Sequence, residues 1–409
     1  MSNAPSVNGF AIGWEDRPWH SDMPPAGAMS RRARLASRGP YRAAVAAEIA
    51  ELPVGLSAET GAAAEDALVE ISRFDAELDQ GLPGAEPNTR LELAPLAAVL
   101  LRTESASSSQ IENVTAGAKA LALATLHEKT GPNATQVVAN VEAMQRALDL
   151  SDELSRDSIL SVHAALMAGQ HHAQPGQFRS GQVWIGSHAP TPHLASFVPP
   201  HADRVEQAIA DLLAFGERTD VPVLAHVAIT HAQFETIHPF ADGNGRTGRA
   251  LVHTMLRRAG ATRRLTVPVS AGLLADTGAY FDALTAYREG DLDPIVARFS
   301  DAAFAGVSNG RTLAADLRAI LGRWSAALTA RRHAAVWRIL PLLIGQPAIT
   351  VRFVQERAAV SQPAAQHAID QLLDAGVVTP ATTGRRNRVW VAEEVVSALD
   401  DFAARARRR

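Results

Sequence analysis

Residues 238–249, with the sequence HPFADGNGRTGR, bring together the side-chain types that phosphate chemistry uses. His238 carries the group that titrates near neutral pH, which makes it a candidate general base. Asp242 is a hard oxygen ligand, suited to a Mg²⁺ ion that is shared with the phosphates of a nucleotide. Arg246 and Arg249 are three residues apart, so they lie on one side of a helical turn and can bind phosphate oxygens.

The elements that must position these side chains are two helices and a glycine turn. Apolar residues spaced three and four apart predict one helix over 224–237 and a second over 247–258. The turn Gly243-Asn244-Gly245 therefore lies at a helix N-terminus, where main-chain N–H groups attract phosphates and glycine lets them approach closely. Asn244 and these N–H groups can stabilise charge on a phosphoryl oxygen. A plain glycine turn is the alternative, but it gives no reason for an acid and two arginines to converge.

The segment resembles the signature loop of Fic-domain proteins, H-x-F-x-[DE]-G-N-G-R-x-x-R, and matches it at every defined position. The resemblance implies transfer of AMP from ATP to a Ser, Thr or Tyr hydroxyl of a target protein, with Mg²⁺ held by Asp242. It implies that the catalytic residues are His238 and Asn244, and that the nucleotide-binding residues are Gly243, Asn244, Gly245, Arg246, Thr247, Gly248 and Arg249. Kinase-like relatives carry Lys where this chain has Gly245, which favours nucleotidyl transfer over γ-phosphoryl transfer.

A second motif lies upstream, where residues 108–113 (SSQIEN) fit the pattern [ST]-x-x-x-E-[GN]. A helix predicted over 91–102 places Glu112 on or beside a helix. The motif is similar to the inhibitory helix of Fic proteins, which implies regulatory roles for Ser108, Glu112 and Asn113. By that resemblance Glu112 pairs with Arg249 of the same chain and occupies the cation that should hold the γ-phosphate, a pair that is costly to break once buried. A helix cap beside a surface acid is the alternative.

Residues 176–186 (GQFRSGQVWIG), followed by 197–200, predict a β-hairpin because a strand-like run is bounded by glycines. The hairpin resembles the flap that covers the Fic site and aligns a target segment by strand addition. We expect His188 and His193, which flank it, to be solvated loop histidines. Tyr280 lies where the family lines its adenine pocket; a place in the core is the alternative.

Composition bounds the remaining possibilities. The chain has 409 residues, of which 47% are hydrophobic and 20% charged, as in ordinary globular proteins. No apolar run approaches the length of a membrane span, and the N-terminus lacks a signal-peptide pattern. The absence of cysteine excludes disulfides and thiolate metal sites. Together these features favour a cytoplasmic protein that does not contact membranes.

The predicted fold is mainly α: a Fic-type helical bundle with a small β-hairpin flap, followed by a winged helix-turn-helix domain. The expected organisation is an irregular arm and helical extension (1–88), a Fic core (89–305), a linker helix (306–332) and a winged-helix domain (333–409). The core would contain the inhibitory helix (about 104–114), the flap (about 176–200) and the catalytic loop (238–249).

The winged-helix prediction comes from the order of elements after residue 333. Helices are expected over 334–344, 351–359 and 361–375, the last capped by Ser361 and ended by Gly376, and two strands then bracket a basic wing at 383–388. Residues 331–409 carry twelve Arg against seven acidic residues, a net charge of +5 in a chain whose net charge is −4. DNA and a docked protein both remain open as partners, since the expected recognition helix has no arginine to read guanine.

The leading interpretation is an autoinhibited protein adenylyltransferase whose target docks along the flap and which also modifies itself. A de-AMPylase or bifunctional enzyme, a transferase of UMP or another nucleotide, and a DNA-binding regulator that only senses nucleotide are the alternatives. The sequence does not decide between a monomer and a homo-oligomer.

Overall fold

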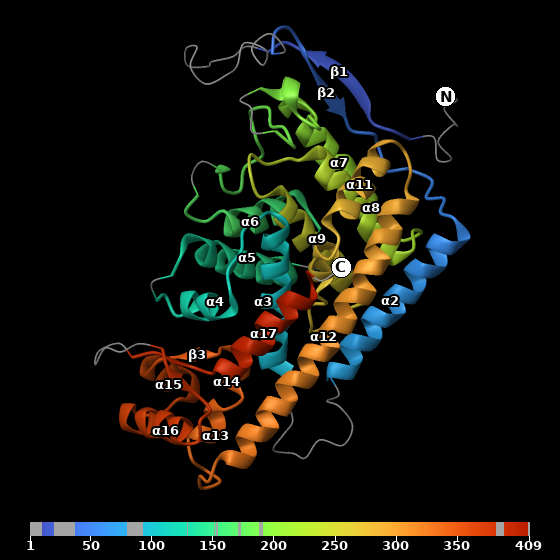
Figure 1. Cartoon of the computed structure of the whole chain (residues 1–409). Coiled ribbons are helices and arrows are strands. Elements are labelled where there is room, and N and C mark those ends of the chain that lie inside the picture. Colours follow the sequence, from blue (N-terminus) through green and yellow to red (C-terminus); the bar gives the residue numbers. More distant parts are fainter. Residues whose placement is uncertain are drawn as a thin grey trace. The chain divides into compact units, whose positions relative to one another are not determined.

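The computed structural model describes residues 10–19, 37–79, 93–128, 130–150, 152, 154–170, 173–187, 191–381 and 388–407. It divides into two units. The first contains residues 1–65, 146–256 and 278–299, and the second contains residues 66–145, 257–277 and 300–409. Helices dominate both units, which confirms the mainly helical fold (Figure 1).

The first unit is built around one fully buried helix. Its elements are β1 (Gly13–Arg17), β2 (Tyr41–Val45), α6 (Arg156–Leu166), η2 (Pro192–Leu194), η3 (Ala202–Arg204), α7 (Val205–Gly216), α8 (Val223–Ile237), and most of α9 (Asn244–Arg258) and α11 (Thr277–Arg288). Every residue from Leu224 to Ile237 is buried, and polar side chains such as His226, His231 and Gln233 lie within hydrogen-bond distance of neighbouring groups. Helix α7 lies beside α8 (Figure 1). The end of α8 is therefore a fixed platform for the loop that follows.

The N-terminal arm, which the sequence predicts to be irregular, contains a strand in its described part. Strand β1 pairs antiparallel with β2, with Gly13 opposite Val45. The main-chain N–H of Ala44 donates to the carbonyl of Val198 at 2.9 Å, so the pair continues onto the return segment of the flap. The alanines in β2 have a low intrinsic preference for strands, and these pairings override it.

The flap itself is less regular than the sequence predicts. Ile185 and Phe197 form an isolated antiparallel bridge, and the described residues between 176 and 200 contain no longer ladder. His193 is not a freely solvated loop residue, because its Nε2 lies 3.1 Å from the carbonyl oxygen of Gly39 and its ring packs against Trp19. The prediction for His188 falls outside the described residues.

The second unit surrounds the helix that carries the upstream motif. Its elements are α3 (Leu93–Ile111), α4 (Ala118–Thr125), α10 (Val269–Leu274) and the C-terminal elements from residue 336 onward, while α2 (Ala58–Asp79), α5 (Pro132–Asp149) and α12 (Asp293–Ala327) have residues in both units. The carboxylate of Glu104, buried in α3, accepts a hydrogen bond from the N–H of Ser270 at 2.9 Å. On another face Asn140 donates to the carbonyl of Ser105 at 2.7 Å. These buried polar contacts fix α3 to its neighbours.

Helix α12 runs without interruption through the expected boundary between the core (89–305) and the linker helix (306–332). Gly310 is not a helix end there. A Cβ at this position would lie 2.8 Å from the Cζ of Phe74, so glycine permits close packing against α2. Arg311 in the next position donates to Glu77 at 2.9 Å, and α2 and α12 lie side by side (Figure 1).

The C-terminal part of the second unit has the order of elements expected for a winged helix. It contains α13 (Val336–Ile339), α14 (Leu342–Gly345), β3 (Ala348–Ile349), α15 (Val351–Ala358), α16 (Gln362–Asp374), β4 (Thr379–Pro380), β5 (Trp390–Val391) and α17 (Glu393–Arg405), with sheet order β3-β5-β4. Residues 334–344 do not form one helix: Pro341, which has no N–H, separates α13 from α14. Gly376 has φ +71°, as a helix-ending glycine requires. Most of the expected wing, residues 382–387, lies outside the described residues.

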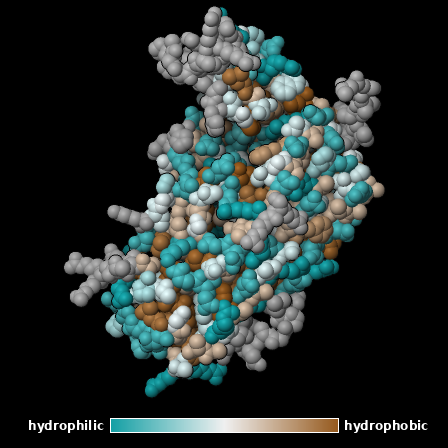
Figure 2. All heavy atoms as spheres, viewed as in Figure 1, coloured by the Kyte–Doolittle hydropathy of each residue, from teal (hydrophilic) through white to brown (hydrophobic). Residues whose placement is uncertain are grey.

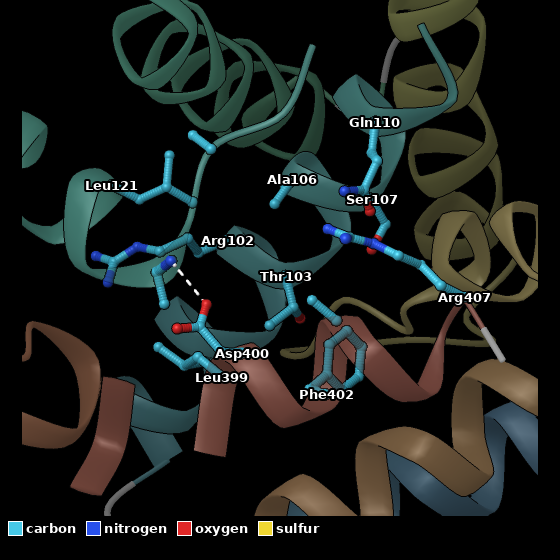
Figure 3. A pocket seen from close by; sticks show the side chains of 13 residues that line it. Arg102, Thr103, Ala106, Ser107, Gln110, Leu121, Leu399, Asp400, Phe402 and Arg407 are labelled. Atoms are coloured by element: carbon cyan, nitrogen blue, oxygen red, sulfur yellow. Dashed lines mark hydrogen bonds between the residues drawn. The ribbon is translucent and has the colours of Figure 1, made fainter. Parts of the chain in front are cut away.

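Helix α17 packs on α3 and α4. The carboxylate of Asp400 accepts a hydrogen bond from the N–H of Ala118 at 3.0 Å, and Lys119 forms an ion pair with Glu393 at 2.7 Å. These three helices line a pocket of about 500 Å³, including its open mouth (Figure 3). Arg407, just beyond α17, points toward Gln110 across it and donates to the amide oxygen of that side chain.

Among the described residues, no helix is long and apolar enough to cross a membrane. Hydrophilic and hydrophobic residues are interspersed over the face that Figure 2 shows.

Candidate active site

The turn at His238 sets the geometry of the candidate site. His238 ends α8 in the left-handed conformation, with φ 51° and ψ 60°, which is uncommon for a residue other than glycine. Its N–H still donates to the carbonyl of Phe234 at 2.9 Å. About a fifth of its side chain is exposed, and its Nδ1 lies 3.7 Å from the carboxylate of Glu235. The imidazole is therefore partly exposed, while its buried Nδ1 faces the buried carboxylate of Glu235.

Phe240 anchors the loop two residues later. Its ring is fully buried and stacks on His163, with centroids 3.6 Å apart and planes 9° from parallel. His163 accepts a hydrogen bond at Nδ1 from the N–H of Gly176 at 3.1 Å, so its Nε2 is the protonated nitrogen and donates to the carbonyl of Asp242 at 3.0 Å. Burial lowers the pKa of His163 to about 4, so the ring is neutral at physiological pH. This ring ties the start of the flap to the loop.

Asn244 closes the loop on itself. Its Oδ1 accepts from the N–H of Phe240 at 2.8 Å, and its Nδ2 donates to the carbonyl of the same residue at 2.9 Å. The side chain is 2% exposed. The amide thus holds the turn through two hydrogen bonds, and the role of Asn244 at a phosphoryl oxygen stays a prediction.

Asp242 lies at the mouth of the loop. Its Oδ1 accepts from the N–H of Gly243 at 2.6 Å, and about half of its side chain is exposed. One half-exposed carboxylate beside a phosphate-binding turn suits Mg²⁺, which takes one or two protein carboxylates and completes its shell with phosphate oxygens and water. The described residues contain no cluster of three or more His, Asp or Glu that could hold a metal alone.

The two arginines lie within the first two turns of α9. Arg246 is 5% exposed and Arg249 2% exposed, and Nη2 of Arg246 lies 3.6 Å from Asp242. Helix α9 begins at Asn244, three residues earlier than the sequence predicts, so Gly245 is inside the first turn. Thr247 is fully buried, and its N–H donates to the carbonyl of Gly243 at 3.0 Å. Two guanidinium groups are thereby held near a helix N-terminus, the arrangement that binds phosphate.

The glycines of the loop are needed where they stand. Gly243 has φ +80°, and a Cβ there would lie 2.6 Å from the Cε of Met167. At Gly248 a Cβ would lie 3.0 Å from the ring of Phe234 in α8. Close packing of α9 against α8 therefore depends on the missing side chain at Gly248.

Tyr280 lies in the core of the first unit. It is 1% exposed, and its hydroxyl lies 2.7 Å from Nε2 of His231. Burial, and then the charge of Arg249, lower the pKa of His231 to about 3. This environment agrees with the core alternative for Tyr280, and its role beside adenine stays a prediction.

The upstream motif lies at the end of α3 in the second unit. Ser108 is fully buried within the helix, and Glu112 follows its last residue as an exposed side chain. Asn113 ends the helix with φ 61°. The prediction that Glu112 lies on or beside a helix is confirmed, and its pairing with Arg249 stays a prediction.

Sequence reasoning missed three residues near the candidate base. Glu235 faces Nδ1 of His238, His163 bonds to Asp242, and the buried Arg179 donates to the carbonyl of His238 at 2.8 Å. The signal for Glu235 was its place three residues before His238 on a predicted helix. His163 and Arg179 act on main-chain atoms, which a sequence pattern does not reveal.

Comparison with known proteins bears on the same segment. Residues 153–256 match the model of the Fic/DOC family. The chain is 28% identical over 146 residues to the protein adenylyltransferase Fic of Nematostella vectensis. The aligned residues make up 36% of this chain and 31% of that protein. It is 32% identical over 152 residues to the protein of the same name from Aedes aegypti, 37% of this chain and 28% of that protein. The matched region thus spans about a third of the length of these curated relatives.

One solved structure shares the fold more widely. A Fic family protein from Desulfovibrio desulfuricans G20 covers 81% of this chain and 95% of its own, with a TM-score of 0.51 and 22% identity. This likeness extends beyond residues 153–256 and concerns the fold alone.

Proposed function

Since the chain carries a Fic domain, we propose that the protein is an autoinhibited protein adenylyltransferase. It would transfer AMP from ATP to a Ser, Thr or Tyr hydroxyl of a target protein and of itself. The observation that supports this most is the loop from His238 to Arg249, where a histidine, a half-exposed carboxylate and two buried arginines meet at the start of α9. Relatives named protein adenylyltransferase match over the same region.

In this mechanism His238 accepts the proton of the target hydroxyl, whose oxygen attacks the α-phosphorus of ATP. The bond between the α-phosphorus and the oxygen that bridges to the β-phosphate breaks, and pyrophosphate leaves. The carboxylate of Glu235, 3.7 Å from Nδ1, stabilises the imidazolium that forms on His238. Because the target would be bound along the flap, its hydroxyl is already placed beside His238. The chemical step then needs no further loss of translational freedom.

The phosphates would be bound by groups of the loop and of α9. Gly243, Asn244 and Gly245 would form the anion hole, with main-chain N–H groups at the start of α9 as donors, while the side-chain amide of Asn244 holds the turn through Phe240. Arg246 and Arg249 bind the β- and γ-phosphates. Asp242 would hold Mg²⁺, which neutralises charge on the phosphates when bound.

Glu112 is proposed to inhibit the same site by pairing with Arg249, which would then be lost to the γ-phosphate. The rigid setting of α3, with buried Glu104 and Ser105 bonded to neighbouring elements, suits a helix that must hold a side chain in one place. In this proposal Ser108 and Asn113 shape the end of α3.

Label transfer from α-³²P-ATP with Mg²⁺ tests the proposal. We expect little self-labelling of the wild type, strong labelling of Glu112→Gly, and none of Glu112→Gly with His238→Ala. Glu51→Gly, which changes an exposed turn glutamate of the first unit, is the matched control and should label like the wild type.

Two results would redirect the assignment. Equal labelling of wild type and Glu112→Gly would exclude the inhibitory role of Glu112. Absence of label from every variant would exclude transfer from ATP, and the next substrates are UTP and an AMP-modified protein.

The C-terminal elements are proposed to form a winged-helix docking module for DNA or for a protein. The order of helices and strands and the β3-β5-β4 sheet support this. Gln362, His367 and Asp370 are exposed on α16, the candidate recognition helix.

A further inference from the structure

The guanidinium of Arg179 occupies an unusual environment for a buried charge. The side chain is 4% exposed, yet all four of its hydrogen bonds go to main-chain carbonyls. Within the described part of the chain, no carboxylate lies within ion-pair distance of it. A buried cation that is not paired with an acid is costly unless its donors are satisfied by other acceptors. Its setting therefore demands an explanation beyond charge neutralisation.

One set of acceptors belongs to the turn of the candidate base. Nε donates to the carbonyl of His238 at 2.8 Å, and Nη2 approaches the carbonyl of Ile237 at 3.4 Å. The main-chain N–H of Arg179 donates to the carbonyl of Pro239 at 2.9 Å. Three successive carbonyls at the end of α8 are thus bound by one residue, where the helix dipole favours a cation. These contacts fix the left-handed turn that aims the His238 side chain.

The other set belongs to the two stems of the flap. Nη1 donates to the carbonyl of Gly181 at 3.0 Å, in the first segment of the flap, and Nη2 donates to that of Pro200 at 2.5 Å, where the flap ends. Between these stems, Ile185 and Phe197 form the bridge of the flap. Arg179 is the common partner of both stems and of the His238 turn.

From this geometry we infer that Arg179 is a positioning residue that fixes the flap relative to His238. The inference rests on the proposed function, in which the flap holds the target hydroxyl and His238 takes its proton. The distance between those two groups is then set through Arg179, although it touches neither substrate. Lysine cannot replace it, because a single ammonium cannot span four carbonyls in the way that a planar guanidinium does.

The kinetic test compares Arg179→Lys with its parent, both in the Glu112→Gly background. We expect kcat for self-modification to fall by about 100-fold, as for a displacement of about 1 Å between reacting groups. The KM for ATP should stay within about 3-fold, since the proposed nucleotide ligands lie at residues 243–249. A kcat within about 3-fold of the parent would overturn the inference.

Arg218→Lys is the matched control. Arg218 also donates to main-chain carbonyls of the first unit, those of Leu52 at 2.6 Å and Ala50 at 3.4 Å, but it contacts neither the flap nor residues 237–239. Its kcat should match that of the parent. An equal loss of kcat in both variants would show that Arg179 contributes only to general stability, and it would overturn the inference.

Hydrogen exchange tests the same inference without any activity, so it distinguishes failure here from failure of the proposed function. In the wild type, the N–H groups of Arg179, Ile185 and Phe197 are bonded to Pro239 and across the flap bridge. Because one residue joins these segments, we expect the three amides to exchange through a single opening, with the same response to low urea.

Separate openings for the flap and for the Pro239 contact would overturn the inference, even if Arg179→Lys does not fold. In a folded Arg179→Lys, exchange should rise at these amides and stay unchanged in α7.

Discussion

Replacing His163 by Gln should change how the stability of the first unit depends on pH. Burial lowers the pKa of His163 from its ordinary value of 6.5 to about 4. In the unfolded chain the ring takes up a proton below about pH 6.5, whereas in the folded chain it stays neutral until about pH 4. The stability that this neutral ring contributes is therefore present above pH 6.5 and is lost as the pH falls toward 4.

The size of the effect follows from the same values. At pH 5 the pH is about 1.5 units below the pKa of the ring in the unfolded chain, whereas the ring in the folded chain is still neutral. Protonation of the unfolded chain therefore lowers the free energy of unfolding of wild type by about 2 kcal/mol, and the variant does not show this loss. The buried His231, whose pKa is about 3, is present in both proteins, so its contribution cancels in the comparison. For a domain of about 150–250 residues this corresponds to roughly 4–8 °C in the unfolding midpoint.

The assay is calorimetric unfolding of wild type and His163→Gln at pH 7.5 and pH 5.0. The drop in midpoint between the two pH values should be larger for wild type by the amount above. His333→Gln, which changes an exposed histidine of the second unit, should behave as wild type. Parallel pH dependences of wild type and His163→Gln would show that His163 is not held neutral by the contacts with Gly176 and Asp242.

Three further predictions concern the loop and the C-terminal elements. Gly243→Ala should lower AMP transfer at least tenfold and lower the unfolding midpoint, because φ is +80° and the new methyl would meet Met167. Adding Met167→Ala should recover only the part of the loss that is due to the clash. Full recovery would argue against backbone strain at residue 243. Asn244→Asp should cost about 1–3 kcal/mol in unfolding free energy, since it removes the donor to the Phe240 carbonyl, and an unchanged calorimetric midpoint would contradict that contact. If residues 333–409 bind DNA, the affinity of the full chain for a promoter fragment should fall steeply between roughly 50 and 200 mM salt, and binding that ignores salt would favour a protein partner.

The helices that hold the loop could be predicted from the sequence because apolar residues recur at helical spacing on both sides of it. The structure places α8 at Val223–Ile237 and α9 at Asn244–Arg258, close to the predicted ranges. What the sequence could not show is how a side chain pairs with main-chain atoms. The two hydrogen bonds between the Asn244 amide and the main chain of Phe240 are of this kind, and the residue types alone do not predict them.

Strands β1 and β2 escaped prediction for a related reason. The run Tyr41–Val45 contains two alanines and reads as part of a helical stretch. Its strand conformation depends on partners far away in the chain, at Gly13–Arg17 and at Val198. Arg179 lies inside a motif that the sequence analysis identified, but its acceptor at His238 is 59 residues away. Long-range pairing of this kind leaves no local pattern.

The packing of α17 on α3 and α4 also has a consequence for the order in which the protein matures. The hydrogen bond between Ala118 and Asp400 joins residues 282 positions apart. During synthesis the loop 238–249 emerges from the ribosome well before α17, since domains form from the N-terminal side onward. A nascent chain therefore contains the loop of the candidate site while α3, which ends just before Glu112, still lacks one of its packing partners. If Glu112 inhibits the site as proposed, inhibition would be complete only after α17 has been synthesised and has packed on α3.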